Sequence, residues 1–247
     1  MKIIVHGIGG RMGAEVAKLA ISGMRGAELV LGVDPYSSFE GVSCHKSFDT
    51  VKDAADCIID FSHHSATPAL LAYAERTGTP VVLATTGHTE EELAAIRLAS
   101  EKVAIFHAAN MSLGVALLIE LAKIAARTMP DAEIEIIEKH HDRKLDAPSG
   151  TALAIANALK TVREDAFFTY GRSGQAKRTK EEIGIHAIRL GNIVGEHEVI
   201  VGTDSQTVTL KHEAHTRALF AEGALAAAEF IIGKEPGLYS MPDMIKI

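Results

Sequence analysis

The first 107 residues alternate short apolar runs with amphipathic stretches, and this alternation limits the folds open to the chain. The apolar runs are 3–5, 29–33, 57–59, 81–83 and 103–106. Amphipathic stretches of helical length lie between most of them, at 12–22, 67–76 and 90–100. Short strands separated by such helices are typical of right-handed βαβ crossovers. The pattern predicts an α/β domain whose parallel sheet binds a ligand beyond the carboxyl ends of its strands.

A glycine-rich turn at residues 7–13, GIGGRMG, follows the first strand and opens the first helix. The spacing Gly7-x-x-Gly10-x-x-Gly13 differs from the dinucleotide fingerprint G-x-G-x-x-G, which would place glycine at position 12. Glycines at these positions still allow a tight turn and a close approach to a pyrophosphate. Asp34 ends the second strand, 21 positions after Gly13, where an acid can bind ribose hydroxyls. An ordinary glycine turn is the alternative interpretation.

Two further loops follow strands of the same predicted sheet. They are Ala84-Thr85-Thr86-Gly87 and Ala108-Ala109-Asn110-Met111. Both can be plain connections. Because strand C-terminal loops surround the ligand in such folds, we expect them near the nicotinamide half of a cofactor.

The pattern changes after Asn110 and predicts an α+β region. Helices are expected at about 112–127 and after Pro148, with a strand at 133–138 between them. The polar segment 163–182, which contains two glycines, is predicted to be a mobile loop. Strand-like segments follow at 185–189, 197–202 and 206–212, and their spacing suggests a meander. An alanine-rich helix at 217–232 is apolar enough to pack back on a core.

Residues 138–152, EKHHDRKLDAPSGTA, bring together several kinds of chemistry. His140 can exchange protons near neutral pH, and Lys144 is a cation that can also donate a proton. Pro148-Ser149-Gly150-Thr151 is typical of a helix start, whose free N–H groups hold carboxylates or phosphates. The segment therefore predicts proton chemistry on an anionic small molecule.

The same segment allows two other interpretations. The histidines and Asp142 can form a polar surface turn followed by an ordinary helix cap. A zinc site is disfavoured because adjacent histidines rarely point at one ion, and no His-Glu-x-x-His helix or Cys-x-x-Cys pair is present. We therefore expect no metal.

The composition of the 247-residue chain excludes several classes of protein. A formal net charge of −7 argues against nucleic acid or an anionic membrane as the main partner. No apolar run reaches about 18 residues, the length of a membrane span. The N-terminus enters a strand directly, without the cleavage pattern of a signal peptide. Cys44 and Cys57 are expected to be buried thiols, so a cytoplasmic location is predicted.

These motifs together resemble those of the 4-hydroxy-tetrahydrodipicolinate reductase family, also called dihydrodipicolinate reductases, over nearly the whole chain. The resemblance rests on GIGGRMG, Asp60-Phe61-Ser62, 84–87, Ala108-Ala109-Asn110 and above all 138–151. The pattern HH-x-x-K-x-DAPSGTA is the most specific of these. The resemblance implies NADH- or NADPH-dependent reduction of 4-hydroxy-tetrahydrodipicolinate to tetrahydrodipicolinate, in the diaminopimelate route to lysine.

The resemblance also implies a fold and a division of labour. A Rossmann-like dinucleotide-binding domain would comprise 1–110 with 218–247. A smaller α+β domain, 111–217, would bind the dicarboxylate substrate and form a homotetramer through its sheet. Carried over by motif, His140 would be the acid–base residue and Lys144 the proton donor, while His141, Gly150 and Thr151 would hold the substrate carboxylate. Arg217 would add a substrate or domain-closure contact. The cofactor would be lined by Gly7, Ile8, Gly9, Gly10, Arg11, Met12, Asp34, Ala84, Thr85, Thr86, Ala108, Ala109, Asn110 and Met111.

Three departures from the family pattern bear on the cofactor rather than on the reaction. Ala84 stands where glycine is frequent, and His88 stands where phenylalanine or tyrosine is common. Pro35 follows Asp34 at a position that carries arginine in members that use NADPH well. A 2′-phosphate beside Asp34 would be repelled unless a cation intervened, so NADH is expected to be favoured. Because Arg11 in the glycine turn can supply such a cation, we expect both cofactors to serve.

Two competing functions remain open from the sequence. The chain can be another small amino-acid dehydrogenase with the same nucleotide domain, such as one acting on aspartate. It can also be a non-catalytic NAD(P)-binding sensor that retains the fold. The histidine–lysine segment argues against the first, and turnover would exclude the second.

Overall fold

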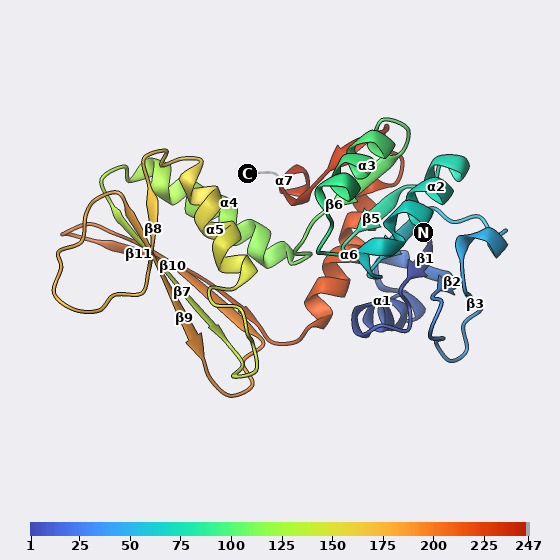
Figure 1. Ribbon diagram of the computed structural model, residues 1–247, viewed down its shortest axis with the longest axis horizontal. Helices are drawn as coiled ribbons and strands as arrows, with labels where there is room; N and C mark the ends of the chain where they lie inside the picture. The colour runs from blue at the N-terminus through green and yellow to red at the C-terminus, as the bar shows by residue number, and fades with distance from the viewer. Residues whose placement is uncertain (246–247) are drawn as a thin grey trace. The chain divides into compact units, whose positions relative to one another are not determined.

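The structure is a computed structural model that describes residues 1–245. The chain forms two compact units (Figure 1). Unit 1 comprises Met1–Ser112 with the described residues from Arg217 onward, and unit 2 comprises Leu113–Thr216. Each unit has its own sheet. Within the described residues, no helix is long and apolar enough to cross a membrane.

Unit 1 is built on a seven-stranded sheet in the order β12-β6-β5-β4-β1-β2-β3. Every pairing in it is parallel, which confirms the α/β prediction. The strands are β1 (Lys2–His6), β2 (Glu28–Val33), β3 (Cys44–His45), β4 (Cys57–Asp60), β5 (Val81–Leu83), β6 (Ala104–His107) and β12 (Gly237–Tyr239). The order reverses direction at β1, whose neighbours are β2 and β4. This switch point is where a parallel sheet leaves a ligand-binding crevice.

Helices pack on both faces of this sheet, so its central strands are buried throughout. The helices are α1 (Arg11–Ile21), α2 (Thr67–Thr77), α3 (Glu90–Ser100), α6 (Ala218–Ile231) and α7 (Met241–Met244). Ile4, Ile58 and Leu83 belong to one core cluster with residues of α2 and α3. Alternate strand residues point to opposite faces, so Ile3, Ile59 and their neighbours form the other core, on the side of α1 and α6. The C-terminal helix α6 thus returns to complete the unit that begins the chain.

Unit 2 has a five-stranded sheet in the order β11-β10-β7-β9-β8. Its strands are β7 (Glu133–His140), β8 (Phe167–Tyr170), β9 (Glu182–Arg189), β10 (Gly195–Gly202) and β11 (Thr207–Ala214). Helices α4 (Leu113–Thr128) and α5 (Gly150–Lys160) pack against one face, where Leu118 and Ile155 share a core with Ile136 (Figure 1). The opposite face carries the alternate residues of each strand.

Two sequence predictions for unit 2 were wrong. The last three long strands do not form a meander, because β9 pairs with β7 in parallel and β10 pairs with the other edge of β7. Residues 163–182 are not a single loop either, since Phe167–Tyr170 forms β8 beside β9. This aromatic and β-branched tetrapeptide favours a strand, but its polar surroundings hid it.

Strand β7 also runs two residues beyond the predicted end, so His140 is its last residue rather than part of the following loop. Both cysteines are free thiols. Cys57 is fully buried, whereas Cys44 is only half-buried, so the prediction of buried thiols holds for one of them.

The Gly223→Ala substitution tests the packing of α6 in unit 1. A Cβ at Gly223 would overlap the carbonyl oxygen of Met111, which is a backbone atom and cannot turn aside as the end of a flexible side chain could. We expect the free energy of unfolding to fall by roughly 1–3 kcal/mol or more in urea denaturation. Glu222→Ala, at the exposed neighbouring position of the same helix, should stay within about 0.5 kcal/mol of the unmodified protein. Equal stability of both variants would contradict this packing.

Candidate functional site

The glycine turn after β1 leaves a helix start open toward the switch point. Gly7 has a positive φ of 77°, and a Cβ there would lie 2.7 Å from the Phe61 carbonyl oxygen. A Cβ at Gly13 would overlap the backbone of Gly7. Helix α1 begins at Arg11 with no side-chain cap and no acidic residue in its first turn. The turn therefore packs tightly against the sheet and presents N–H groups suited to a phosphate.

Asp34 follows β2 and holds the glycine turn in place. One of its oxygens accepts a 3.0 Å hydrogen bond from the N–H of Gly9. The other accepts 2.9 Å hydrogen bonds from the N–H groups of Tyr36 and Ser37. Carboxylate oxygens have about four acceptor sites, so the group can still accept hydrogen bonds from a ligand.

A pocket of about 590 Å³ lies beside this turn. Gly7, Gly10 and Asp34 line it, as do Pro35, Tyr36, His6 and residues of the loop after β4, namely Phe61, Ser62, His63, Ser65 and Ala66. Tyr36 is almost fully exposed. The combination of a glycine turn, an uncapped helix start and an acid after the second strand fits a dinucleotide.

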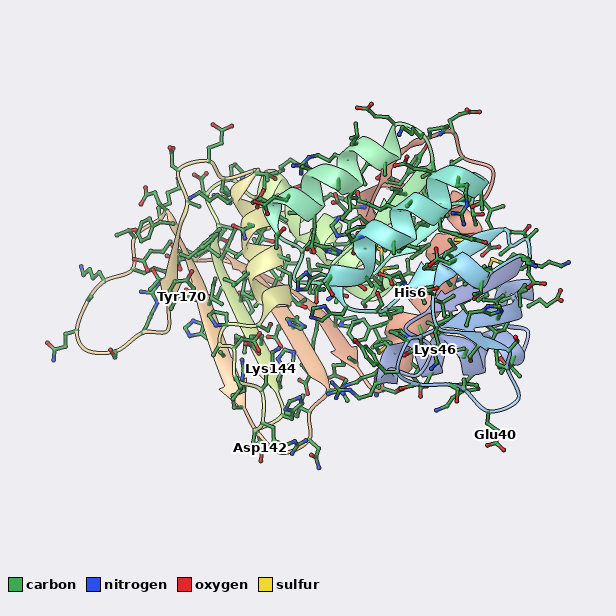
Figure 2. The ribbon with its side chains drawn as sticks, turned by 45° about the vertical axis from the view of Figure 1, so that its right-hand side comes forward. His6, Glu40, Lys46, Asp142, Lys144 and Tyr170 are labelled. Carbon is green, nitrogen blue, oxygen red and sulfur yellow. The ribbon has the colours of Figure 1, made fainter. Side chains whose placement is uncertain are left out.

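Asp60, the last residue of β4, links this strand to β1 and to the loop after β5. It is buried, and its carboxylate accepts a 2.6 Å hydrogen bond from the Thr85 hydroxyl and a 3.2 Å bond from the N–H of Ser62. His6 Nδ1 lies 2.7 Å from the same carboxylate, and Figure 2 labels His6 within unit 1. Asp60 therefore fixes the loop of Thr85 and Thr86 relative to β1 and β4.

The remaining predicted cofactor residues lie at the carboxyl ends of the parallel strands, as the glycine turn does. Ala84 and Thr85 come directly after β5, and 108–111 follow β6. The side chains of Ile8 and Met111 are buried in the core of unit 1, so these two residues can offer a ligand only their backbone. Arg217, predicted to contact substrate, is the exposed N-cap residue of α6 and falls in unit 1.

In unit 2, the segment between β7 and α5 carries the predicted catalytic residues. His140 ends β7, Lys144 lies in the following loop, and Ser149 caps α5 by accepting a hydrogen bond from the Ala152 N–H. Figure 2 labels Lys144 and Asp142 on this loop. The structure thus brings His140, Lys144, Gly150 and Thr151 into one short stretch around the start of a helix.

Glu138 is the buried centre of this stretch. Its carboxylate accepts a 2.6 Å hydrogen bond from His140 Nδ1 and a 2.9 Å bond from the Ser149 N–H. Arg189, the last residue of β9, donates two 2.8 Å hydrogen bonds to it. Burial alone would raise the pKa of Glu138, but the hydrogen bonds from His140, Arg189 and Ser149 outweigh it and lower the pKa to about 2. The side chain is therefore an ionised carboxylate despite being fully buried.

His197 on β10 completes the buried polar group. Its Nε2 lies 3.2 Å from the Ser149 hydroxyl, and its ring meets that of His140 edge to face at 5.2 Å. Burial, together with the nearby charge of His140, lowers the pKa of His197 to about 4. His197 is therefore neutral at physiological pH and supports the helix cap.

Lys144 already holds a carboxylate in this structure. Its Nζ lies 2.9 Å from Asp146 Oδ1. The hydrogen bond from Lys144 lowers the pKa of Asp146, and the N–H of Gly150 acts in the same direction. Lys144, with a smaller contribution from the first residue of α5, thus acts on the carboxylate of Asp146.

The sequence analysis missed Arg189 and His197, which lie on β9 and β10. Arg189 is one of several polar residues of β9, and His197 stands between two glutamates in β10, so strand alternation alone cannot assign either residue to a site. Glu138 lies within the same motif, but the sequence gives no signal of its role, whereas Ser149 falls at the predicted helix start and is the N-cap of α5.

Comparisons with known proteins cover the whole chain. The family model described as "Dihydrodipicolinate reductase, N-terminus" matches residues 1–111, and "Dihydrodipicolinate reductase, C-terminus" matches residues 114–245. A relative from Caldanaerobacter subterraneus subsp. tengcongensis, named 4-hydroxy-tetrahydrodipicolinate reductase, is 47% identical over 100% of this chain and 98% of its own length. A relative of the same name from Clostridium novyi is 44% identical over 99% and 98%.

Among solved structures, the dipicolinate-bound dihydrodipicolinate reductase from Paenisporosarcina sp. TG-14 matches 99% of both chains, with a TM-score of 0.84 at 24% identity. The aspartate dehydrogenase from Thermotoga maritima matches 95% of this chain and 97% of its own, with a TM-score of 0.53 at 10% identity. At these identities, both likenesses concern the fold alone.

The depressed pKa of His197 predicts a pH dependence of stability. The ordinary pKa of histidine is 6.5, and the pKa of His197 in the folded protein is about 4. Between these two pH values the unfolded chain binds a proton at His197 more readily than the folded protein does. The contribution of neutral His197 to the free energy of unfolding is fully present above pH 6.5 and is lost as the pH falls toward 4. In urea denaturation across this range, His197→Gln should show a shallower fall in the free energy of unfolding than the unmodified protein. Equal slopes would show that His197 titrates normally.

Proposed function

Since the chain belongs to the dihydrodipicolinate reductase family, it is an oxidoreductase that reduces 4-hydroxy-tetrahydrodipicolinate in diaminopimelate and lysine biosynthesis, and we propose that NADH or NADPH supplies the hydride. Unit 1 is the proposed dinucleotide-binding domain and unit 2 the proposed substrate domain. The observation that carries the proposal for unit 2 is the action of Lys144 and Gly150 on one carboxylate, beside His140.

The residues of unit 1 fit a nicotinamide dinucleotide. A glycine turn too tight for side chains, an uncapped helix start and Asp34 surround the same pocket. Gly7 to Met12 would hold the pyrophosphate and Asp34 the ribose hydroxyls, while 84–86 and 108–111 would lie near the nicotinamide. When bound, the nicotinamide ring supplies a hydride that no amino-acid side chain can provide.

The residues of unit 2 would bind and protonate the substrate. In this proposal, the substrate carboxylate takes the position on Lys144 and Gly150 that Asp146 uses in the structure, with His141 and Thr151 as further contacts. These groups orient the ring and stabilise negative charge that builds up as it is reduced. Lys144, assisted by His140, then donates a proton. Arg217 is proposed as an additional substrate contact.

Coupled turnover tests this function. The product of dihydrodipicolinate synthase is offered to the protein, and cofactor absorbance is followed with NADH and NADPH separately. Oxidation of the cofactor that depends on the synthase supports reduction of this substrate. Cofactor binding without turnover would support the non-catalytic sensor instead, and turnover with aspartate or another amino acid alone would support the other dehydrogenase class.

We also propose a homotetramer formed through the sheet of unit 2, in the cytoplasm. Among the described residues, helices α4 and α5 cover only one face of this sheet. The uncovered face carries Ile137, Ile188 and Ile200, which are half-exposed among charged residues such as the pair Lys139 and Glu196. Apolar residues gathered on an open sheet face favour association between copies of the chain.

Lys144→Ala should lower kcat by about two orders of magnitude or more while the fold survives, because it removes a proton donor and a partner of the substrate carboxylate. His140→Ala should act chiefly on kcat as well. Lys177→Ala, which removes an exposed lysine elsewhere in unit 2, is the matched control and should retain turnover. Near-normal kcat in both site variants would show that the catalytic residues lie elsewhere.

Cofactor choice follows from Asp34. Its carboxylate would accept hydrogen bonds from ribose hydroxyls but repel a 2′-phosphate, and Pro35 provides no cation. Arg11 in the glycine turn and His63 at the same pocket can offset this repulsion, so both cofactors should bind, with NADH favoured.

Asp34→Ala should therefore weaken NADH more than NADPH in titrations that follow cofactor fluorescence. Asp53→Ala, at an exposed position outside the pocket, should leave both dissociation constants unchanged. Tighter binding of NADPH than of NADH by the unmodified protein would show that the basic groups outweigh Asp34.

A further inference from the structure

We propose that Glu138 and Arg189 are positioning residues for the reaction, because their buried ion pair fixes the ring of His140, the loop of Lys144 and the start of α5 in one arrangement. The inference rests on the proposed function, in which His140 exchanges a proton and Lys144 binds substrate. Neither Glu138 nor Arg189 needs to touch the substrate for this role.

Hydrogen-bond donors occupy both oxygens of the Glu138 carboxylate. One oxygen accepts hydrogen bonds from Arg189 and the Ser149 N–H, and the other accepts bonds from Arg189 and His140. A carboxylate has about four acceptor sites, and all four donors lie within 2.9 Å. With its side chain fully buried, Glu138 has no freedom to turn without leaving a buried donor unpaired.

The contact with Glu138 determines the tautomer of His140. An ionised carboxylate can only accept hydrogen bonds, so His140 Nδ1 must carry a hydrogen and donate it. The proton that is exchanged in the reaction therefore belongs to Nε2. A Cβ at Gly195 would lie 3.1 Å from this atom, so the glycine keeps the space beside Nε2 open. The pair thus determines which nitrogen of His140 does chemistry.

Arg189 contacts both oxygens of Glu138 through its guanidinium. This fixed positive charge favours the ionised carboxylate, together with the hydrogen bonds from His140 and the Ser149 N–H. The same guanidinium donates a 2.5 Å hydrogen bond to the backbone carbonyl of Asp146, two positions after Lys144. Arg189 therefore holds the lysine loop relative to the histidine.

Other charged and titratable neighbours do not replace this pair. His197 packs against the His140 ring but is neutral at physiological pH and bonds the Ser149 hydroxyl. Lys144 pairs with Asp146 instead. Among the hydrogen bonds of the described residues, Glu138 is the side chain that contacts both His140 and the backbone at the start of α5.

The test uses Glu138→Gln in the full chain, with Glu164→Gln as the matched control at an exposed position of the same unit. A glutamine amide has two donors and cannot accept hydrogen bonds at all four sites. In either orientation, its NH₂ group therefore faces an N–H donor of His140, Arg189 or Ser149. We expect kcat to fall by about tenfold or more, with KM for the cofactor unchanged. The control variant should match the unmodified protein.

A spectroscopic readout separates positioning from a general structural role. The ¹⁵N shifts of the His140 ring, assigned by comparison with His140→Gln, report which nitrogen carries the hydrogen in the substrate-free protein. The unmodified protein should show the Nδ1–H tautomer, and Glu138→Gln should shift it toward Nε2–H. An Nε2–H tautomer in the unmodified protein, or an unchanged tautomer in the variant, overturns the proposal even if turnover falls.

Arg189→Lys keeps the inference testable if Glu138→Gln does not fold. Lysine preserves the charge but cannot reach both Glu138 oxygens and the Asp146 carbonyl together. The tautomer should persist, while KM for the substrate should rise several-fold because the Lys144 loop is released. Unchanged kcat and KM would overturn the role of Arg189. A complete lack of turnover in the unmodified protein would instead defeat the proposed function, and the tautomer measurement would still test the pair.

Discussion

The buried carboxylate of Glu138 is the interaction on which the arrangement of unit 2 depends. Ionised carboxylates are costly to bury unless every acceptor site is satisfied, and here four donors from β7, β9 and the start of α5 do so. The same contacts that remove the desolvation penalty also align His140 and anchor the helix start. Stability and the geometry of the proposed chemistry therefore come from one group.

The function proposed for unit 1 has a different physical requirement, because there a backbone must come close to an anion. Glycines at positions 7 and 13 pack where side chains would collide, and α1 starts without a cap, so its N–H groups remain directed at the crevice. Asp34 and Asp60 then fix the surrounding loops through hydrogen bonds to backbone and hydroxyl groups.

How much the sequence could predict depended on whether the interactions were local. The glycine turn, Asp34 and the stretch from His140 to Thr151 are continuous or follow predicted strands, so pattern and resemblance were sufficient to identify them. Arg189 reaches Glu138 only because β9 pairs with β7 in parallel, and the assumed meander concealed that pairing. His197 depends on β10 lying on the other side of β7. Strand order is set by tertiary packing, which alternation along one strand does not encode. The roles assigned to the site residues remain proposals.

The most direct test of the account is isotope transfer from cofactor to substrate. NADH carrying deuterium at the reactive C4 position is supplied with the product of dihydrodipicolinate synthase, and the reduced product is examined by mass spectrometry and NMR. The account predicts one deuterium at a ring carbon of each product molecule, since the hydride passes directly from nicotinamide to substrate. Oxidation of NADH that leaves no deuterium in the product would contradict it.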